Sequence, residues 1–283
     1  MTVGEALTHG RERLKAFGDD GRFDALRLLE EMLARNAAWI FAHGDAPFDV
    51  ETFARYAAVI ARRVAREPVA YIVGTAGFYG RTFAVTPDVL VPRPETEFIV
   101  DLACQALRDA ALATPRVCDV GTGSGILAVT LACELDGARV TAIDISPRAA
   151  GVAAYNAETH GVAERVRCVS GDTFGGIADA DAFDCIVANL PYLCSDDLET
   201  ARTTLGFEPR LALDGGNDGL DAYRRLLATA PQRLAEGGLM LMEAGIDTTY
   251  RLAVLVGSAF GPRACIHVHR DYAGHPRVVD IRT

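Results

Sequence analysis

The sequence predicts an α/β protein, in which a doubly wound mixed sheet is preceded by a small helical domain and a linking β-hairpin. Three observations predict this fold class. The chain has 283 residues, enough for two ordinary domains. Its first quarter has the apolar spacing of helices, and the remainder alternates apolar, β-branched runs with helical stretches of about 10 to 15 residues. With 50% hydrophobic and 23% charged residues, the composition is that of a globular protein.

Capping signals and leucine spacing define the helical domain, to which we assign residues 1–74. Thr2 and Glu5 have the spacing of a capping box, in which both side chains satisfy free amides at a helix start. Asp49 is placed to cap a further helix over residues 51–64. Leucines between these signals recur at helical intervals, at Leu26, Leu29 and Leu33.

A strand-like stretch follows the helical domain. Residues 78–91 read as two short strands, with Gly80 and Arg81 as the turn between them. We therefore expect residues 75–92 to form a β-hairpin that links the two domains.

The rest of the chain, residues 93–283, has the strand–helix alternation of a sheet covered on both faces. The five predicted buried strands cover residues 117–120, 140–145, 166–169, 185–188 and 239–243. Two last strands, at 265–269 and 278–281, are joined by a short connection through Gly274. We expect them to form an antiparallel hairpin at the end of the sheet.

The charge is unevenly distributed between the two parts of the chain. There are 28 basic and 38 acidic residues, a net charge of −10. Residues 1–85 contain equal numbers of each, so the whole excess lies in residues 86–283. A phosphate backbone requires a basic surface, so we do not expect a nucleic acid as the partner.

Several classes of protein and site are not expected. No apolar run is long enough to span a membrane, and the first residues lack the pattern of a secretory leader. Seven cysteines without a C-x-x-C pair indicate free thiols and a cytoplasmic protein. His267 and His269 share one face of a late strand, but no third ligand lies near them in sequence, so we expect no metal. Arg62, Arg63 and Arg66 form either a solvated helix face or a docking patch for an acidic protein.

A glycine-rich loop follows the first buried strand and opens a helix. Glycines at this point let the backbone turn tightly and approach a ligand. The candidate cofactor-binding residues of this loop are Asp119, Gly121, Thr122, Gly123 and Gly125. Asp144 ends the next strand, where a carboxylate can accept both ribose hydroxyls, and Asp172 follows the third strand, where it could meet an adenine amino group.

Two cofactors and a purely structural role compete for this loop. A dinucleotide places its pyrophosphate at the helix N-terminus, where the nearby Asp119 would be unfavourable. S-adenosylmethionine carries an ammonium and a sulfonium group, which suit an acidic rim. Alternatively, the glycines serve only to pack a strand against a helix. The aspartates favour S-adenosylmethionine.

The tetrapeptide Asn189-Leu190-Pro191-Tyr192 follows the fourth buried strand. An amide or exocyclic amine is a weak nucleophile because its lone pair is delocalised. The Asn189 side-chain oxygen and the Leu190 carbonyl can each accept one N–H and so orient that lone pair, while Tyr192 offers a stacking face. Pro191 keeps Leu190 extended. Such a site works by positioning, and Asn189 also adjoins the cofactor. An ordinary Asn-x-Pro turn is the alternative.

With the glycine loop, Asp144 and Asp172, the chain resembles a class I S-adenosylmethionine-dependent methyltransferase. The tetrapeptide fits the signature of enzymes that methylate planar nitrogen. Protein-(glutamine-N5) methyltransferases that act on peptide chain release factors usually have Asn-Pro-Pro-Tyr. Ribosomal RNA adenine dimethylases commonly have Asn-Leu-Pro-Tyr, as this chain does.

Four further segments resemble the release-factor family: residues 67–74, 89–97, 207–223 and 270–277. The second contains Pro-Arg-Pro-Glu-Thr-Glu, which the RNA dimethylases lack. The resemblance covers essentially the whole chain. It implies S-adenosylmethionine as cofactor, a glutamine amide of a release factor as substrate, and a helical domain that grips this protein.

The resemblance also implies a substrate loop and exposes one departure. Arg93, Pro94, Thr96 and Glu97 would lie on a loop facing cofactor and substrate. Leu190 stands where the family has proline. Three alternatives therefore stay open: an RNA adenine-N6 methyltransferase, a paralogue that methylates another amide or amine, and a cofactor-binding protein without activity.

Overall fold

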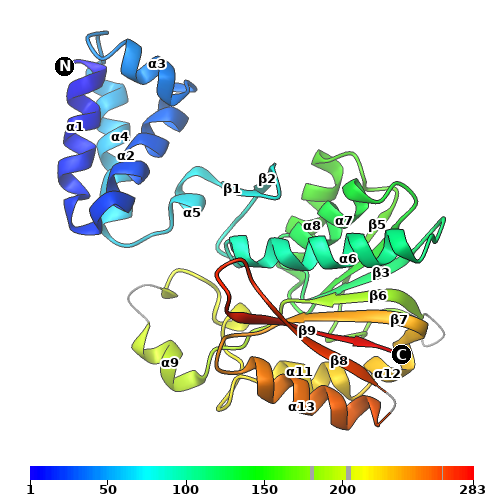
Figure 1. Ribbon diagram of the computed structural model, residues 1–283. Coiled ribbons are helices and arrows are strands. Elements are labelled where there is room, and N and C mark those ends of the chain that lie inside the picture. The colour runs from blue at the N-terminus through cyan, green and yellow to red at the C-terminus, as the bar shows by residue number, and fades with distance from the viewer. Residues whose placement is uncertain (179–181, 202–204, 263) are drawn as a thin grey trace. The chain divides into compact units, whose positions relative to one another are not determined.

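The computed structural model describes residues 1–178, 182–201, 205–262 and 264–283 (Figure 1). The chain forms two compact units, Met1–Thr75 and Ala76–Thr283. Each unit has a hydrophobic core of its own.

The first unit is helical. Its helices are α1 (Val3–Arg13), η1 (Lys15–Phe17), α2 (Gly18–Leu33), α3 (Ala37–Ala42), α4 (Val50–Val64) and α5 (Val69–Val73). Thr2 and Glu5 form the predicted capping box, and Asp49 accepts a 2.9 Å hydrogen bond from the Thr52 amide at the start of α4. The buried Tyr56 hydroxyl donates to the Ala25 carbonyl at 2.9 Å and so ties α4 to α2.

The three arginines of α4 and its C-terminus have partners inside this unit. Arg62 pairs with Glu67, and Arg63 pairs with Asp24 at 2.7 Å. The guanidinium groups of Arg63 and Arg66 both lie over the ring of Phe17, at 4.3 and 4.6 Å from its centre. These contacts support the solvated-face interpretation over a patch held free for a partner.

The linking hairpin consists of β1 (Thr75–Phe78) and β2 (Arg81–Ala84). Its turn lies at Tyr79 and Gly80, which have positive φ values of 49° and 69°. The predicted turn was at Gly80 and Arg81. Two consecutive positive φ values suit the twist of a tight hairpin. The predicted turn was therefore one residue late, and residues 85–91, which the strand prediction included, lie outside any strand.

A seven-stranded mixed sheet forms the second unit. Its strands are β3 (Arg116–Val120), β4 (Arg139–Asp144), β5 (Val166–Ser170), β6 (Phe183–Ala188), β7 (Leu234–Glu243), β8 (Cys265–Arg270) and β9 (Pro276–Arg282). The order is β5-β4-β3-β6-β7-β9-β8. The first five strands are parallel, and β9 is antiparallel to both of its neighbours. The predicted fold class and closing hairpin are confirmed, with β9 inserted between β7 and β8.

Helices cover both faces of this sheet (Figure 1). On one face lie α6 (Glu97–Asp109), α7 (Ile126–Glu134) and α8 (Pro147–Thr159); on the other lie α11 (Asp221–Leu227), α12 (Ala230–Arg233) and α13 (Thr249–Phe260). Each face of the sheet therefore has its own hydrophobic core. Because side chains alternate along a strand, Val117 packs into the core beneath α6 and α7, and Cys118 packs into the core on the opposite face, beneath α11 and α13. Shorter helices η2 (Pro94–Thr96), α9 (Ser195–Thr200) and η3 (Arg210–Ala212) lie in the connections.

The strand order places a crevice at the carboxyl ends of β3 and β6. The chain runs from β3 outward to β5 on one side and then returns to β6 on the other. At such a reversal the loops after neighbouring strands diverge, and open sheets bind ligands there. None of the described helices is long and apolar enough to cross a membrane.

Candidate active site

The glycine loop after β3 has the backbone that its sequence predicts. Gly121 and Gly123 have φ values of 76° and 55°, a region that residues with a Cβ rarely adopt. The amides of Gly121 and Thr122 donate to the Ile143 carbonyl at 2.8 and 2.9 Å, which fixes the loop against β4. A Cβ on Gly123 would meet nothing within 4 Å, so the loop leaves open space beside it.

Asp119 lies beneath this loop and is 1% exposed. One carboxylate oxygen, Oδ2, accepts hydrogen bonds from the Thr122 hydroxyl at 2.6 Å and the Ala128 amide at 3.1 Å. The other, Oδ1, has no hydrogen-bond partner among the described residues. Burial raises the pKa of Asp119 to about 7, against the effect of these two hydrogen bonds. A cation bound beside Oδ1 would satisfy it and stabilise the ionised form.

Asp144 ends β4 with both oxygens held by backbone amides. Oδ2 accepts from Gly123 and Oδ1 from Ser146, each at 2.9 Å. Burial raises its pKa, while the two hydrogen bonds lower it. Each oxygen keeps a second lone pair, so the carboxylate can also accept a pair of neighbouring hydroxyls.

A cavity of about 200 Å³ brings most of the predicted cofactor residues together. Its lining includes Asp119, Gly121, Thr122, Gly123, Asp144, Asp172 and Asn189. Gly125 is outside this lining; it is the N-cap residue of α7, with a φ of 81°, and a Cβ there would lie 3.0 Å from Ala153 of α8. Asp172 also lines this cavity, and its carboxylate lies 3.4 Å from the Arg225 guanidinium.

A second cavity of about 190 Å³ adjoins the first. Both are lined by Leu90, Arg93, Asn189, Leu190 and Ala212. Tyr192 lines only the second of the two. Two adjoining cavities that meet at Asn189 suit a reaction between two separately bound molecules.

Asn189 and Leu190 are oriented by residues from other elements. The Asn189 side-chain nitrogen donates to the Thr96 hydroxyl at 3.0 Å, which leaves its carbonyl oxygen free of that contact. The Tyr223 hydroxyl lies 3.3 Å from the Leu190 nitrogen and 3.2 Å from its carbonyl oxygen. Since a carbonyl has two lone pairs, this contact still leaves one for a substrate N–H.

The Leu190 side chain is 8% exposed and packs against the glycine loop. Its Cδ2 atom lies 2.6 Å from where a Cβ on Gly121 would be. The side chain therefore belongs to the core between the tetrapeptide and the loop, although it lines both cavities.

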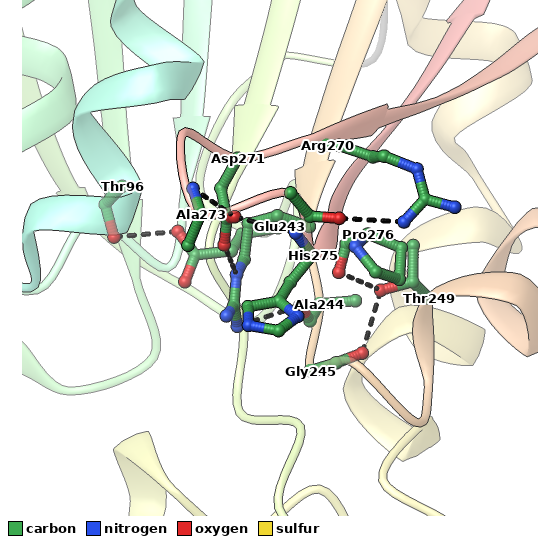
Figure 2. Close-up of polar contacts among 12 residues, drawn as sticks. Thr96, Glu243, Ala244, Gly245, Thr249, Arg270, Asp271, Ala273, His275 and Pro276 are labelled. Carbon is green, nitrogen blue, oxygen red and sulfur yellow. Dashed lines mark hydrogen bonds and ion pairs between the residues drawn. The ribbon is translucent and has the colours of Figure 1, made fainter.

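Glu243 and Tyr223 are site residues that sequence reasoning missed. Glu243, the last residue of β7, is 1% exposed, and its carboxylate accepts a 2.7 Å hydrogen bond from the Thr96 hydroxyl (Figure 2). Burial raises the pKa of Glu243 to about 7, while the hydrogen bond from Thr96 and the positive charge of Arg277 lower it. Burial also raises the pKa of Tyr192 to about 12.

The predicted substrate loop divides into residues inside and outside the site. Arg93 and Thr96 line the first cavity, and the Arg93 guanidinium pairs with the buried Glu208. Pro94 opens the short helix η2. Glu97 starts α6, and its carboxylate accepts a 2.6 Å hydrogen bond from the Tyr79 amide in the linking hairpin. Neither Pro94 nor Glu97 is among the described residues that line the two cavities.

The late-strand histidines are not among the described residues that line the two cavities. His267 and His269 each contact the carboxylate of Asp280 on β9, both at 3.0 Å. Within the described ranges, no group of three or more His, Cys, Asp or Glu side chains could hold a metal ion.

Comparison with known proteins identifies the family. The PrmC N-terminal domain matches residues 5–74, and the ribosomal protein L11 methyltransferase (PrmA) family matches residues 100–192. The release factor glutamine methyltransferase of Bordetella pertussis is 43% identical over 91% of this chain and 93% of its own length. That of Cereibacter sphaeroides is 40% identical over 100% and 99%. The chain belongs to the release factor glutamine methyltransferase family.

Solved structures agree on the fold. The Thermus thermophilus 16S rRNA N2 G1207 methyltransferase, solved in complex with AdoMet and guanosine, has a TM-score of 0.55 at 19% identity. The match covers 74% of this chain and 49% of that one. Together with its family, this fold makes the protein a class I methyltransferase, and membership of the release factor glutamine methyltransferase family gives it S-adenosylmethionine as its cofactor. The unpartnered Asp119 oxygen and the open glycine loop fit that cation.

Proposed function

We propose that this protein transfers the methyl group of S-adenosylmethionine to the side-chain amide nitrogen, N5, of a glutamine in a peptide chain release factor. The observation that carries the proposal is the position of Asn189 and Leu190 where the two cavities meet. Curated relatives at 36% to 43% identity bear the name release factor glutamine methyltransferase, which supports this substrate over RNA adenine.

The first cavity supplies the groups that would hold the cofactor. The free Asp119 oxygen suits the ammonium group, Asp144 suits the ribose hydroxyls, and Asp172 is placed for the adenine end. When bound, S-adenosylmethionine supplies an electrophilic methyl group on its sulfonium sulfur. The glycine backbone lets this molecule approach without a Cβ in its way.

The second cavity would hold the glutamine side chain, with its nitrogen at the junction. The Asn189 carbonyl oxygen and the Leu190 carbonyl each accept one N–H of the substrate amide. Both acceptors hold the amide plane so that one face of the nitrogen points toward the first cavity. This catalysis is by orientation, and effective positioning can supply several orders of magnitude in rate.

Leucine at position 190 is compatible with this proposal because the substrate contact uses the backbone carbonyl. Its side chain packs against Gly121 and belongs to the core of the sheet, although it also lines both cavities. Pro191 follows it and keeps its backbone extended. The substitution therefore changes core packing more than the acceptor geometry.

The helical unit is the proposed docking surface for the protein substrate. It matches the PrmC N-terminal domain over residues 5–74 and folds around its own core. We also propose a cytoplasmic location, because all seven cysteines are free thiols. The acidic excess of residues 86–283 supports a partner that is not nucleic acid.

The test is incubation of the protein with labelled S-adenosylmethionine and purified release factor, followed by peptide mapping. We expect label on a single glutamine nitrogen. Asn189→Ala is expected to lower kcat by about 100-fold or more, with the affinity for S-adenosylmethionine little changed. Asn217→Ala, at an exposed position, is the matched control. Label on RNA, or an undiminished rate in Asn189→Ala, would contradict the proposal.

A further inference from the structure

A chain of hydrogen bonds behind Asn189 is not required by any substrate contact proposed above. It runs from the Asn189 side-chain nitrogen to the Thr96 hydroxyl at 3.0 Å, and from that hydroxyl to the Glu243 carboxylate at 2.7 Å. Thr96 is 0% exposed and Glu243 is 1% exposed, so water does not compete for these bonds. Figure 2 shows the link between Thr96, before α6, and Glu243, at the end of β7.

The direction of each bond follows from the chemistry of its ends. An ionised carboxylate has no hydrogen to donate, so the Thr96 hydroxyl must donate to Glu243. The Thr96 oxygen then offers lone pairs alone to Asn189. The amide nitrogen of Asn189 satisfies this acceptor, and its carbonyl oxygen would not. Ionised Glu243 thus dictates which end of the Asn189 amide faces the two cavities.

We propose that Glu243 is a positioning residue that acts through Thr96 to lock the Asn189 carbonyl oxygen toward the substrate amide. This inference rests on the proposed function, since it explains how the acceptor for that amide is held. With Asn189 reversed, its NH2 group would face the N–H groups of the substrate. Two donors would then meet, and the nucleophile would be misaligned.

Several groups on the surrounding elements act on the Glu243 charge. Arg277 of β9 and the hydroxyls of Thr96 and Tyr192 favour ionisation, while burial and Glu95 of η2 oppose it. Tyr223 of α11 contacts the Glu243 backbone carbonyl. Arg277 itself donates to the Asp271 carboxylate at 3.2 Å. These opposing influences leave the Glu243 pKa at about 7, so the lock weakens as the pH falls below neutrality.

The first test uses three variants of nearly unchanged shape. Glu243→Gln can donate to Thr96 as a protonated acid does, and Thr96→Val removes the hydroxyl; Thr96→Ser restores it. We expect kcat to fall by about 10- to 100-fold in the first two and to recover in Thr96→Ser. The affinity for S-adenosylmethionine should not change. The double variant should lose no more activity than the worse single variant, because both break one chain. Glu236→Gln, at an exposed position on the same strand, is the control.

The second test needs no turnover. The side-chain NH2 signals of Asn189, assigned by their loss in Asn189→Ala, are followed by ¹H–¹⁵N spectroscopy from pH 5.5 to 8.5. We expect a shift with a midpoint near 7 in the unsubstituted protein and none in Glu243→Gln, with kcat rising over the same range. An unshifted signal, or full activity with an unaltered pH profile in both chain-breaking variants, overturns the positioning role. Absence of glutamine methylation by the unsubstituted protein would instead overturn the proposed function.

Discussion

At the scale of single residues, Asp119 combines a proposed role in cofactor binding with an unfavourable burial. Its pKa in the folded protein is about 7, above its ordinary value of 3.8. Between these pH values the folded protein binds a proton that the unfolded chain does not. The stabilising effect of that proton is fully present below the ordinary pKa and is lost as the pH rises through about 7.

We therefore expect Asp119→Asn to raise the free energy of unfolding at pH 8, on the order of 2 kcal/mol, while weakening S-adenosylmethionine binding. The gain should shrink as the pH is lowered toward 5. Urea unfolding at both pH values measures this, with the exposed Asp136→Asn as the control. Equal stability of variant and unsubstituted protein at pH 8 would contradict the explanation.

Asp119 and Asp144 were predicted from the sequence because Asp119 lies next to the glycine loop near the end of a buried strand and Asp144 ends the next strand. The same rule applies to Glu243, which ends the predicted strand 239–243. Its position in the sequence therefore already marked it as a candidate site residue. Its partner Thr96 lies 147 residues away in sequence, and only the folded sheet brings them together. Tyr223 was indicated only as the last residue of the family-like segment 207–223. Its residue type pointed to no site role, because an aromatic residue on an amphipathic helix usually packs in the core.

At the scale of elements, the glycine loop contains two residues with different constraints. Gly121→Ala would combine an unfavourable φ of 76° with a Cβ 2.6 Å from Leu190. Gly123→Ala would meet only the unfavourable φ. We expect losses of unfolding free energy of about 3 kcal/mol for the first and about 1 kcal/mol for the second. Chemical denaturation of the two variants side by side measures the difference; equal losses would contradict it.

Asn156 of α8 holds the linking hairpin to the glycine loop. Its side chain is fully buried, donates to the carbonyls of Ala84 and Ser124 at 2.9 and 2.8 Å, and accepts from the Ala84 amide at 2.8 Å. Asn156→Ala would leave these groups buried without their partner, and we expect a loss of about 2 to 4 kcal/mol. Thermal unfolding measures it, and faster hydrogen exchange at the Ala84 amide should accompany it. An effect no larger than that of Asn217→Ala would count against this role.

The boundaries of elements were predicted best at helix starts, where the side chain of a capping residue binds a free backbone amide. Asp49 and Thr2 cap the helices they were expected to cap. The hairpin turn was displaced because Tyr79 adopts a positive φ, which an aromatic residue seldom does and which the sequence alone does not indicate. The insertion of β9 between β7 and β8 was also missed, because apolar patterning does not specify which strand a hairpin pairs with.

At the scale of the whole molecule, the separate cores of the two units allow them to be tested apart. All the described residues that line the two cavities lie in the unit Ala76–Thr283. A chain lacking residues 1–74 should bind S-adenosylmethionine with an unchanged dissociation constant, measured by calorimetry. Its kcat/KM for intact release factor should fall by about 10-fold or more, since the proposed docking surface would be removed.

Circular dichroism shows whether the shortened chain is folded. A folded product with full activity on the release factor would remove the docking role from the helical unit. Lost cofactor binding in a folded product would show that the cofactor site depends on residues 1–74.

The position of β9 has a consequence for the protein while it is being synthesised. Translation delivers β7 and β8 before β9, yet β9 is the strand that separates them in the finished sheet. Until residues 276–282 emerge, the nascent chain carries an open strand edge along β7, and such edges pair readily with other chains. A ribosome that stalls before β9 has emerged, or a nonsense codon before residue 276, would thus yield an aggregation-prone product that depends on chaperones.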